Sequence, residues 1–182
     1  GFDKESLKIL KKKKNLRLID ATNFLMKDLV KFSSTHGSIL TQFEDLKKFN
    51  IKDFKVVSKK KPNNTQLKNL VFAFNICRYV KSNAIVLATE GTTVGIGSGQ
   101  PSRLDSCQIA IDKMNKYQNL KEEVVAASDA FFPFVDGIEK LIQSGVSAVI
   151  QPSGSIRDKE IIKFANQTNT VLVFSKTRHF RH

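Results

Sequence analysis

The first residues that could do chemistry form a glycine-rich loop, Gly95-Ile96-Gly97-Ser98-Gly99-Gln100, with Arg103 close behind it. Such a turn between a strand and a helix can present backbone N–H groups and a positive helix end to a phosphate or a carboxylate. The sequence lacks the Lys-Ser or Lys-Thr of a P-loop and the third glycine of a dinucleotide fingerprint. The glycines therefore fit close backbone packing as well as ligand binding, whereas a guanidinium one turn later can grip an anion through two N–H groups.

The segment from Ser128 to Asp136 is unusual because three Phe and one Pro lie between acidic residues. It belongs to neither a plain helix nor a plain strand. One interpretation is a buried aromatic loop that plugs a core. The other is an aromatic wall for a flat ring, with Asp136 accepting hydrogen bonds from an amino-substituted heterocycle or tuning a proton transfer.

Two later segments complete the set. Residues Gln151 to Asp158 follow an expected strand and precede an expected helix, so Ser155 or a neighbouring N–H should face the space above the strand ends, where ligands gather in open α/β sheets. The chain ends on Arg178 to His182, with two Arg and two His. Such termini are usually frayed, so we expect a loose tail unless something docks it.

Composition narrows the class of protein. The 182 residues suggest one domain with a sizeable core, and the net charge of +13 predicts attraction to polyanions: a nucleic acid, a phosphorylated nucleotide or a polycarboxylate such as a folate. The basic runs Lys11–Lys14 and Lys59–Lys61 contain no aromatics, which favours solvated faces over single-strand binding. A basic nucleic-acid-binding module is therefore the alternative hypothesis, and it depends on charge alone.

The cysteine content, and the absence of a secretory signal and of a membrane span, indicate the cellular location that we expect for this chain. Cys77 and Cys107 are too far apart and too few for a disulfide framework or a zinc knuckle, so we expect both to be small core residues in a reducing cytoplasm. No secretory signal follows Gly1, and no apolar stretch approaches the roughly 20 residues of a membrane span. We therefore expect no membrane association. Because the sequence starts at Gly1 with no initiator Met, we also expect a chain that is either processed or a piece.

Apolar spacing predicts the elements that would position these segments. Helices are expected over 3–14, 65–81, 102–114, 134–142 and 157–166, with a weak capping box from Ser102 to Asp105. Strands are expected over 39–40, 55–58, 84–88, 93–96, 146–150 and 171–174, with a hairpin turn at Glu90-Gly91. Strands that alternate with helices at these lengths indicate crossover units and a mixed or parallel sheet.

Five separated stretches together resemble one family, the bifunctional AICAR formyltransferase and IMP cyclohydrolase of de novo purine synthesis, where AICAR is aminoimidazole carboxamide ribonucleotide. The sequence resembles its bacterial members from the first lysine-rich helix to the end. The matching stretches are Val80 to Ala84, Gly95 to Gln100 with Ser102-Arg103, Ser128 to Phe134, Gln151 to Asp158, and Arg178 to His182.

The resemblance implies a three-layer α/β/α fold of the cytidine-deaminase-like kind with a mixed sheet. Residues 1–182 would be the C-terminal part of the formyltransferase domain, with the upstream part and the cyclohydrolase domain absent. The implied reaction moves a formyl group from 10-formyltetrahydrofolate to AICAR, giving FAICAR, and the other domain of the full-length enzyme closes the ring to IMP. The resemblance also implies a homodimer, a monovalent cation such as potassium, and no zinc, since the deaminase zinc signature is missing.

Roles carried over by position give a set of expected site residues. AICAR contacts would be Asn83, Arg103, Phe131 and Arg178; folate contacts would be Leu104, Asp136, Ser155 and Ile156; and a cation site would involve Asp129 and His182.

The proton-transfer pair of the family, a Lys and a His, lies before the residue that matches Gly1. None of His36, His179 and His182 sits in that motif, so this chain would bind substrates without the main catalytic pair, and Asp136 would at most assist. Val135 departs from the family, which usually has Arg there, and this removes one charge beside the expected folate site.

Overall fold

The computed structural model describes residues 1–24, 30–116 and 123–181. It divides the chain into two compact units, Gly1–Glu44 and Asp45–His182, rather than the one domain that length alone suggested. Each unit is described by itself. In the described part of the chain, no helix is long and apolar enough to cross a membrane.

The first unit contains one short helix and one hairpin. Helix α1 (Lys4–Leu10) begins at Asp3, whose carboxylate accepts a hydrogen bond from the Ser6 N–H at 2.8 Å. It ends at Leu10, before the predicted end at residue 14. Strands β1 (Val30–Thr35) and β2 (Ser38–Phe43) pair antiparallel, so the short strand expected at 39–40 is part of a longer one.

The second unit is built on a six-stranded mixed sheet with the order β3-β8-β7-β6-β4-β5. Strands β6, β7 and β8 run parallel, whereas β4 is antiparallel to both β5 and β6, and β3 is antiparallel to β8. The predicted hairpin is confirmed. The strands are β3 (Phe54–Val56), β4 (Ile85–Thr89), β5 (Thr92–Gly97), β6 (Val124–Ser128), β7 (Val146–Pro152) and β8 (Val171–Ser175).

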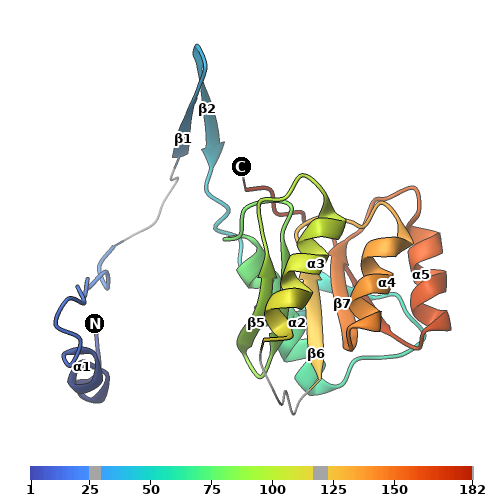
Figure 1. Cartoon of the computed structure of the whole chain (residues 1–182), viewed down its shortest axis with the longest axis horizontal. Helices are drawn as coiled ribbons and strands as arrows, with labels where there is room; N and C mark the ends of the chain where they lie inside the picture. Colours follow the sequence, from blue (N-terminus) through green and yellow to red (C-terminus); the bar gives the residue numbers. More distant parts are fainter. Residues whose placement is uncertain (25–29, 117–122, 182) are drawn as a thin grey trace. The chain divides into compact units, whose positions relative to one another are not determined.

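Helices cover both faces of this sheet, which makes the three layers that the family resemblance implied (Figure 1). Helix α2 (Asn64–Cys77) packs on one face, and helices α3 (Arg103–Met114), α4 (Val135–Gln143) and α5 (Asp158–Gln167) pack on the other. Alternate residues of each strand feed the two cores. In β4, for example, Ile85 belongs to the cluster beneath α3 and α4, and Val86 to the cluster beneath α2.

Strand β6 is the one element of this sheet that sequence analysis missed. Its residues Val124–Ser128 are all buried, because strands and helices enclose it on every side. Strands β4 and β8 are just as buried and were predicted from their runs of large apolar residues. Strand β6 contains two alanines, which are depleted in strands, so its sequence gives a weaker strand signal.

Some predicted boundaries also differ from the structure. Helix α2 ends at Cys77 rather than residue 81, and it starts at a capping box in which Asn63 and Gln66 bond reciprocally. The capping box predicted at Ser102 is wrong, because Ser102 makes no side-chain bond to the first turn of α3. The side chain of Arg103 anchors the start of that helix instead.

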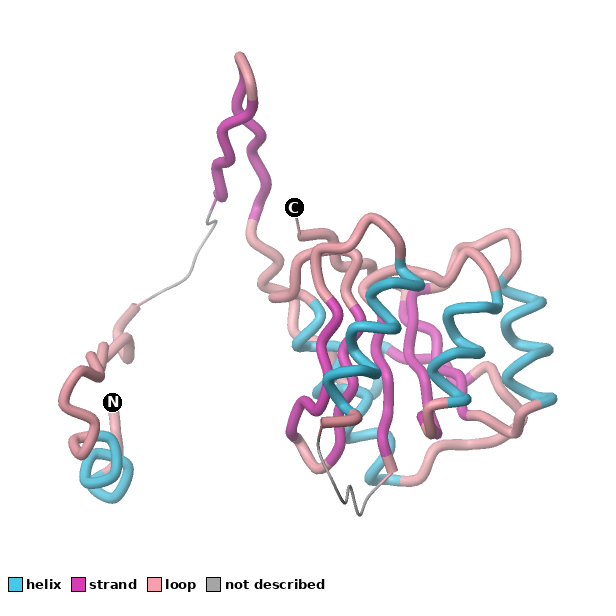
Figure 2. Tube along the Cα trace, viewed as in Figure 1, coloured by secondary structure: helices cyan, strands magenta, loops and turns pink. Residues whose placement is uncertain are grey.

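The segments with chemical potential meet at one edge of the sheet. Ile85, the first residue of β4, pairs with Gly97 at the end of β5 and with Ser128 at the end of β6. The ends of β7 and β8 lie at the same edge, since both run parallel to β6. The connecting loops and the C-terminal tail therefore gather where the parallel strands end, as Figures 1 and 2 show.

Candidate functional site

A pocket of about 500 Å³, called the main pocket below, lies at this edge of the sheet. Six of the eight expected substrate contacts line it. They come from the segment before β4, the start of α3, the loop after β6, the start of α4 and the C-terminal tail: Asn83, Arg103, Leu104, Phe131, Asp136 and Arg178.

Arg103 is held at the bottom of a polar network. Its side chain is only 9% exposed and forms an ion pair with Asp129, which is fully buried. The nitrogen that forms this ion pair, Nη1, also donates to the Ser128 hydroxyl at 2.8 Å. The other terminal nitrogen, Nη2, donates to the Asn83 side-chain oxygen at 2.7 Å. Two terminal nitrogens are thus already engaged by the protein, and the charge of Arg103 is balanced by Asp129.

Asn83 ties the glycine-rich loop to this network. Its amide nitrogen donates to the carbonyl oxygens of Gln100 and Pro101, each at 3.0 Å. Its backbone carbonyl accepts a hydrogen bond from the Ser106 hydroxyl at 2.8 Å. Asn83 therefore positions Arg103 and the loop, in addition to lining the pocket.

The aromatic segment serves both of the purposes considered from the sequence. Phe132 is 1% exposed and plugs the core, where its ring sits so close to Gly137 that an added Cβ there would lie 2.7 Å from the ring. Phe131 is half-buried and faces the pocket, with the Arg178 guanidinium 4.8 Å from its ring centroid. Phe134 is 51% exposed and also lines the pocket.

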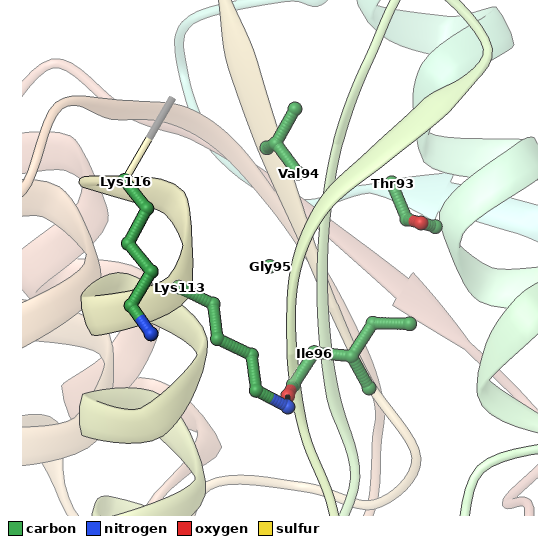
Figure 3. Close-up of a pocket in the computed structure, with 6 residues that line it drawn as sticks. All are labelled: Thr93, Val94, Gly95, Ile96, Lys113 and Lys116. Carbon is green, nitrogen blue, oxygen red and sulfur yellow. Dashed lines mark hydrogen bonds between the residues drawn. The ribbon is translucent and has the colours of Figure 1, made fainter. Parts of the chain in front are cut away.

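Two glycines of the glycine-rich segment, Gly95 and Gly97, belong to strand β5 and allow close packing against helix α3. A Cβ at Gly95 would lie 2.1 Å from the Ala110 carbonyl oxygen, and one at Gly97 would lie 1.9 Å from that of Ser106. Figure 3 shows Gly95 on β5 beside helix α3, where Lys113 reaches across to donate to the Ile96 carbonyl at 2.7 Å. The glycines let α3 approach β5, and this approach brings Arg103 to the pocket.

The loop after β7 lies outside the main pocket. Ser155 and Ile156 do not line it, and the side chain of Ile156 is fully exposed. Ser155 instead bonds within its own loop, accepting from the Arg157 N–H at 3.1 Å. Arg157 connects this loop to the pocket, because its guanidinium stacks 4.7 Å from the ring centroid of Phe134.

The C-terminal tail is docked, which corrects the expectation of a frayed end. The His179 N–H donates to the Asp129 carbonyl at 2.9 Å, and the Ser82 N–H donates to the Arg181 carbonyl at 3.0 Å. His179 is 1% exposed and bonds to Asp45. His182, expected at a cation site, lies outside the described residues.

Both cysteines are buried, as predicted. Burial raises the pKa of the Cys107 thiol to about 12. The pKa of Cys77 is also raised, by burial first and by the negative charge of Asp129 second. Among the residues that the structure describes, no group of three His, Cys, Asp or Glu side chains could hold a metal ion.

Sequence reasoning did not single out Phe180 as a pocket residue, nor Asp45 and Phe49 as partners of the tail. Phe180 could have been predicted, because alternate residues of an extended segment lie on the same side and Arg178 was already expected in the site. Asp45 and Phe49 lie about 130 positions from His179 in the sequence, and no local pattern links them.

Comparisons with known proteins place this arrangement in a family. The model of the AICARFT/IMPCHase bienzyme family matches residues 1–113. The protein named bifunctional purine biosynthesis protein PurH from Oenococcus oeni is 46% identical over all of this chain, and the protein of the same name from Ligilactobacillus salivarius is 43% identical. The chain spans 36% and 35% of the lengths of these relatives.

A solved structure, the apo dCMP deaminase from cyanophage S-TIM5, aligns with 62% of this chain and 98% of its own, at 15% identity and a TM-score of 0.41. The family model covers more than half of the chain, and the relatives match its full length. The chain therefore belongs to the AICARFT/IMPCHase bienzyme family.

Proposed function

We propose that this chain is the substrate-binding, C-terminal part of a formyltransferase domain, which moves a formyl group from 10-formyltetrahydrofolate to AICAR in purine biosynthesis. The other domain of the whole protein would close the ring to IMP. The names of the relatives, which describe bifunctional purine biosynthesis proteins, support this proposal. The observation that carries it is the convergence of six expected contacts, distant in the sequence, on the main pocket.

AICAR combines an anionic phosphate with a flat, amino-substituted ring, and the pocket offers groups suited to both. Arg178 is exposed and carries the positive charge that an anion requires. Phe131 supplies a flat apolar wall on which an imidazole ring can stack. Arg103 and Asn83 form the polar floor, with Arg103 fixed by Asp129 before any ligand enters.

The folate would occupy the side of the pocket formed by Leu104 and Asp136. Asp136 lies in the first turn of α4 and is exposed, so its carboxylate can accept hydrogen bonds from the amino-substituted ring of a pterin. Ser155 and Ile156 lie in the neighbouring loop, which Arg157 links to Phe134. We propose that this loop contacts the folate from outside the main pocket.

Formyl transfer needs a base that takes a proton from the attacking amine and a donor that stabilises the oxyanion. His179 is buried and bonded to Asp45, so it cannot serve as a base in the pocket. We place the catalytic Lys and His in the part of the family domain that precedes this chain. The full-length enzyme should therefore formylate AICAR, whereas residues 1–182 alone should bind AICAR without turnover. Turnover by the isolated chain would contradict this division.

The proposed monovalent cation site centres on Asp129. Its Oδ2 atom is buried and has no hydrogen-bond partner among the described residues, while Oδ1 pairs with Arg103. A buried carboxylate oxygen of this kind suits a cation, which would satisfy it and leave the Arg103 ion pair in place. We also propose a homodimer, as the family resemblance implies.

The alternative function, a nucleic-acid-binding module, rests on the net charge of +13. It predicts tight binding to random oligonucleotides whose logarithmic affinity falls steeply with the logarithm of salt concentration. Gel shifts at two salt concentrations, beside calorimetry with AICAR, separate the two functions. Strong, salt-sensitive oligonucleotide binding without AICAR binding would favour the alternative.

A further inference from the structure

The C-terminal tail, residues 177–181, alternates between the main pocket and the core. Arg178 and Phe180 line the pocket, whereas His179 between them is 1% exposed. Successive side chains of an extended segment point to opposite sides. The burial of His179 therefore determines the side to which Arg178 and Phe180 project.

The first residues of the second unit hold the tail from the core side. Asp45 bonds to Nδ1 of His179 through its carboxylate, and the Lys47 amine donates to the Thr177 hydroxyl at 3.1 Å. Phe49 packs edge-on against the His179 ring, with centroids 5.0 Å apart. The segment from Asp45 to Phe49 thus clamps the tail through a carboxylate–imidazole contact, a hydrogen bond and a ring contact.

Helix α2 and two loops hold the remaining sides. The Phe74 ring of α2 lies 4.7 Å from the His179 ring, centroid to centroid. The His179 N–H donates to the Asp129 carbonyl at 2.9 Å, and the Arg181 N–H donates to the Ser82 hydroxyl at 3.2 Å. The tail is fixed on all these sides, and the exposed guanidinium of Arg178 stacks on Phe131 as a result.

We propose that Asp45 and His179 are positioning residues for ligand binding. They clamp the tail so that Arg178 is oriented to bind the phosphate of a nucleoside monophosphate. A tail without the clamp would have to be ordered when the ligand binds, and affinity would fall by that entropic cost. The identity of the ligand rests on the proposed function, but the clamp itself does not.

The test combines binding with the local stability of the tail. Calorimetry with AICAR compares wild type, His179→Ala, Arg178→Ala and the double variant. We expect His179→Ala to weaken binding about tenfold, which corresponds to about 1.4 kcal/mol for ordering the tail when the ligand binds. The double variant should bind no more weakly than Arg178→Ala alone, because His179 acts through Arg178. Full affinity of His179→Ala, or additive losses in the double variant, would overturn the inference.

Two further variants separate positioning from stability. His179→Phe keeps a ring between Phe49 and Phe74 but cannot bond to Asp45, and it should also bind AICAR more weakly. Ile138→Val removes a methylene group from the core on the other face of the sheet and should leave the affinity unchanged. His36→Ala, a matched change in the exposed turn of the first unit, should also have no effect.

Hydrogen exchange of the backbone N–H groups tests the clamp in the absence of any ligand. Backbone N–H groups of residues 178–181 should exchange faster in His179→Phe and Asp45→Asn than in wild type, because the tail opens more often. Unchanged exchange would overturn the clamp. A wild-type chain that does not bind AICAR would overturn the proposed function, while faster exchange in the variants would still support the clamp.

Discussion

Arg103 and Asp129 form a buried ion pair at the end of strand β6, with side chains 9% and 0% exposed. The pair connects the first residue of α3 to the loop that carries Phe131. Because each charge is balanced by the other, the floor of the main pocket is organised before ligand binds. Arg178, which is exposed on the docked tail, is then the cation available to an incoming anion.

Loss of one partner of this pair should be costly. Asp129→Ala leaves the guanidinium of Arg103 buried and uncompensated, and we expect the free energy of unfolding to fall by about 3–5 kcal/mol. Urea denaturation followed by circular dichroism measures the change. Asp136→Ala, which removes an exposed carboxylate from the same pocket, is the matched control and should change stability by less than about 0.5 kcal/mol. Equal effects of the two variants would contradict the assigned role of the pair.

Close contact between β5 and α3 predicts a second effect. Gly97→Ala would place a Cβ 1.9 Å from the Ser106 backbone oxygen, which a side-chain rotation cannot relieve. We expect a loss of at least about 1–3 kcal/mol of stability, the usual cost of overpacking. Thermal unfolding compares it with Thr92→Ala, an exposed change in the same strand. An unfolding temperature for Gly97→Ala as high as that of Thr92→Ala would show that close packing of β5 against α3 does not require glycine at this position.

The buried thiols give a prediction about pH. Only the thiolate reacts with disulfide reagents, and burial raises the pKa of Cys107 to about 12 from an ordinary 9.0. Native protein at pH 8 should therefore not react with such a reagent on the timescale of minutes. In denatured protein both thiols are exposed and should react. A native thiol that reacts as fast as a denatured one would contradict the burial.

The same shift links Cys107 to stability, and its sign is fixed. Below pH 9 the thiol is protonated in both the folded and the unfolded protein, so its contribution is fully present. Above that pH the unfolded chain releases the proton first, and stability falls as pH rises toward about 12. Wild type should lose more stability between pH 9 and pH 11 than Cys107→Ala, which urea denaturation at both pH values can measure.

Most of the architecture could be predicted because local patterns determine it. The apolar face of α3, the Glu90-Gly91 turn and the strands on either side of α5 each follow from residues close together in the sequence. Strand β6 was missed because its two alanines give a weak strand signal, whereas the equally buried β4 and β8 carry runs of large apolar residues. The division at Glu44 was not predicted either, since length alone does not locate a boundary between compact units.

The candidate site was predictable only in part, for a related reason. The family resemblance gave the positions that line the pocket, but not which of them the protein itself engages. That Asn83 and Asp129 hold Arg103, and that Asp45 holds His179, depends on contacts between segments 20 to 134 positions apart. Local sequence patterns carry no information about such pairs.

The central claim is that the main pocket binds AICAR through Arg178. Calorimetric titration of AICAR into the chain and into its Arg178→Ala variant tests it directly, because Arg178 is exposed and its loss should leave the fold intact. We predict measurable binding by wild type and a loss of about 1.5–3 kcal/mol of binding free energy in the variant, as for a charged hydrogen bond. Equal affinity of the two proteins, or no binding by either, would contradict the claim.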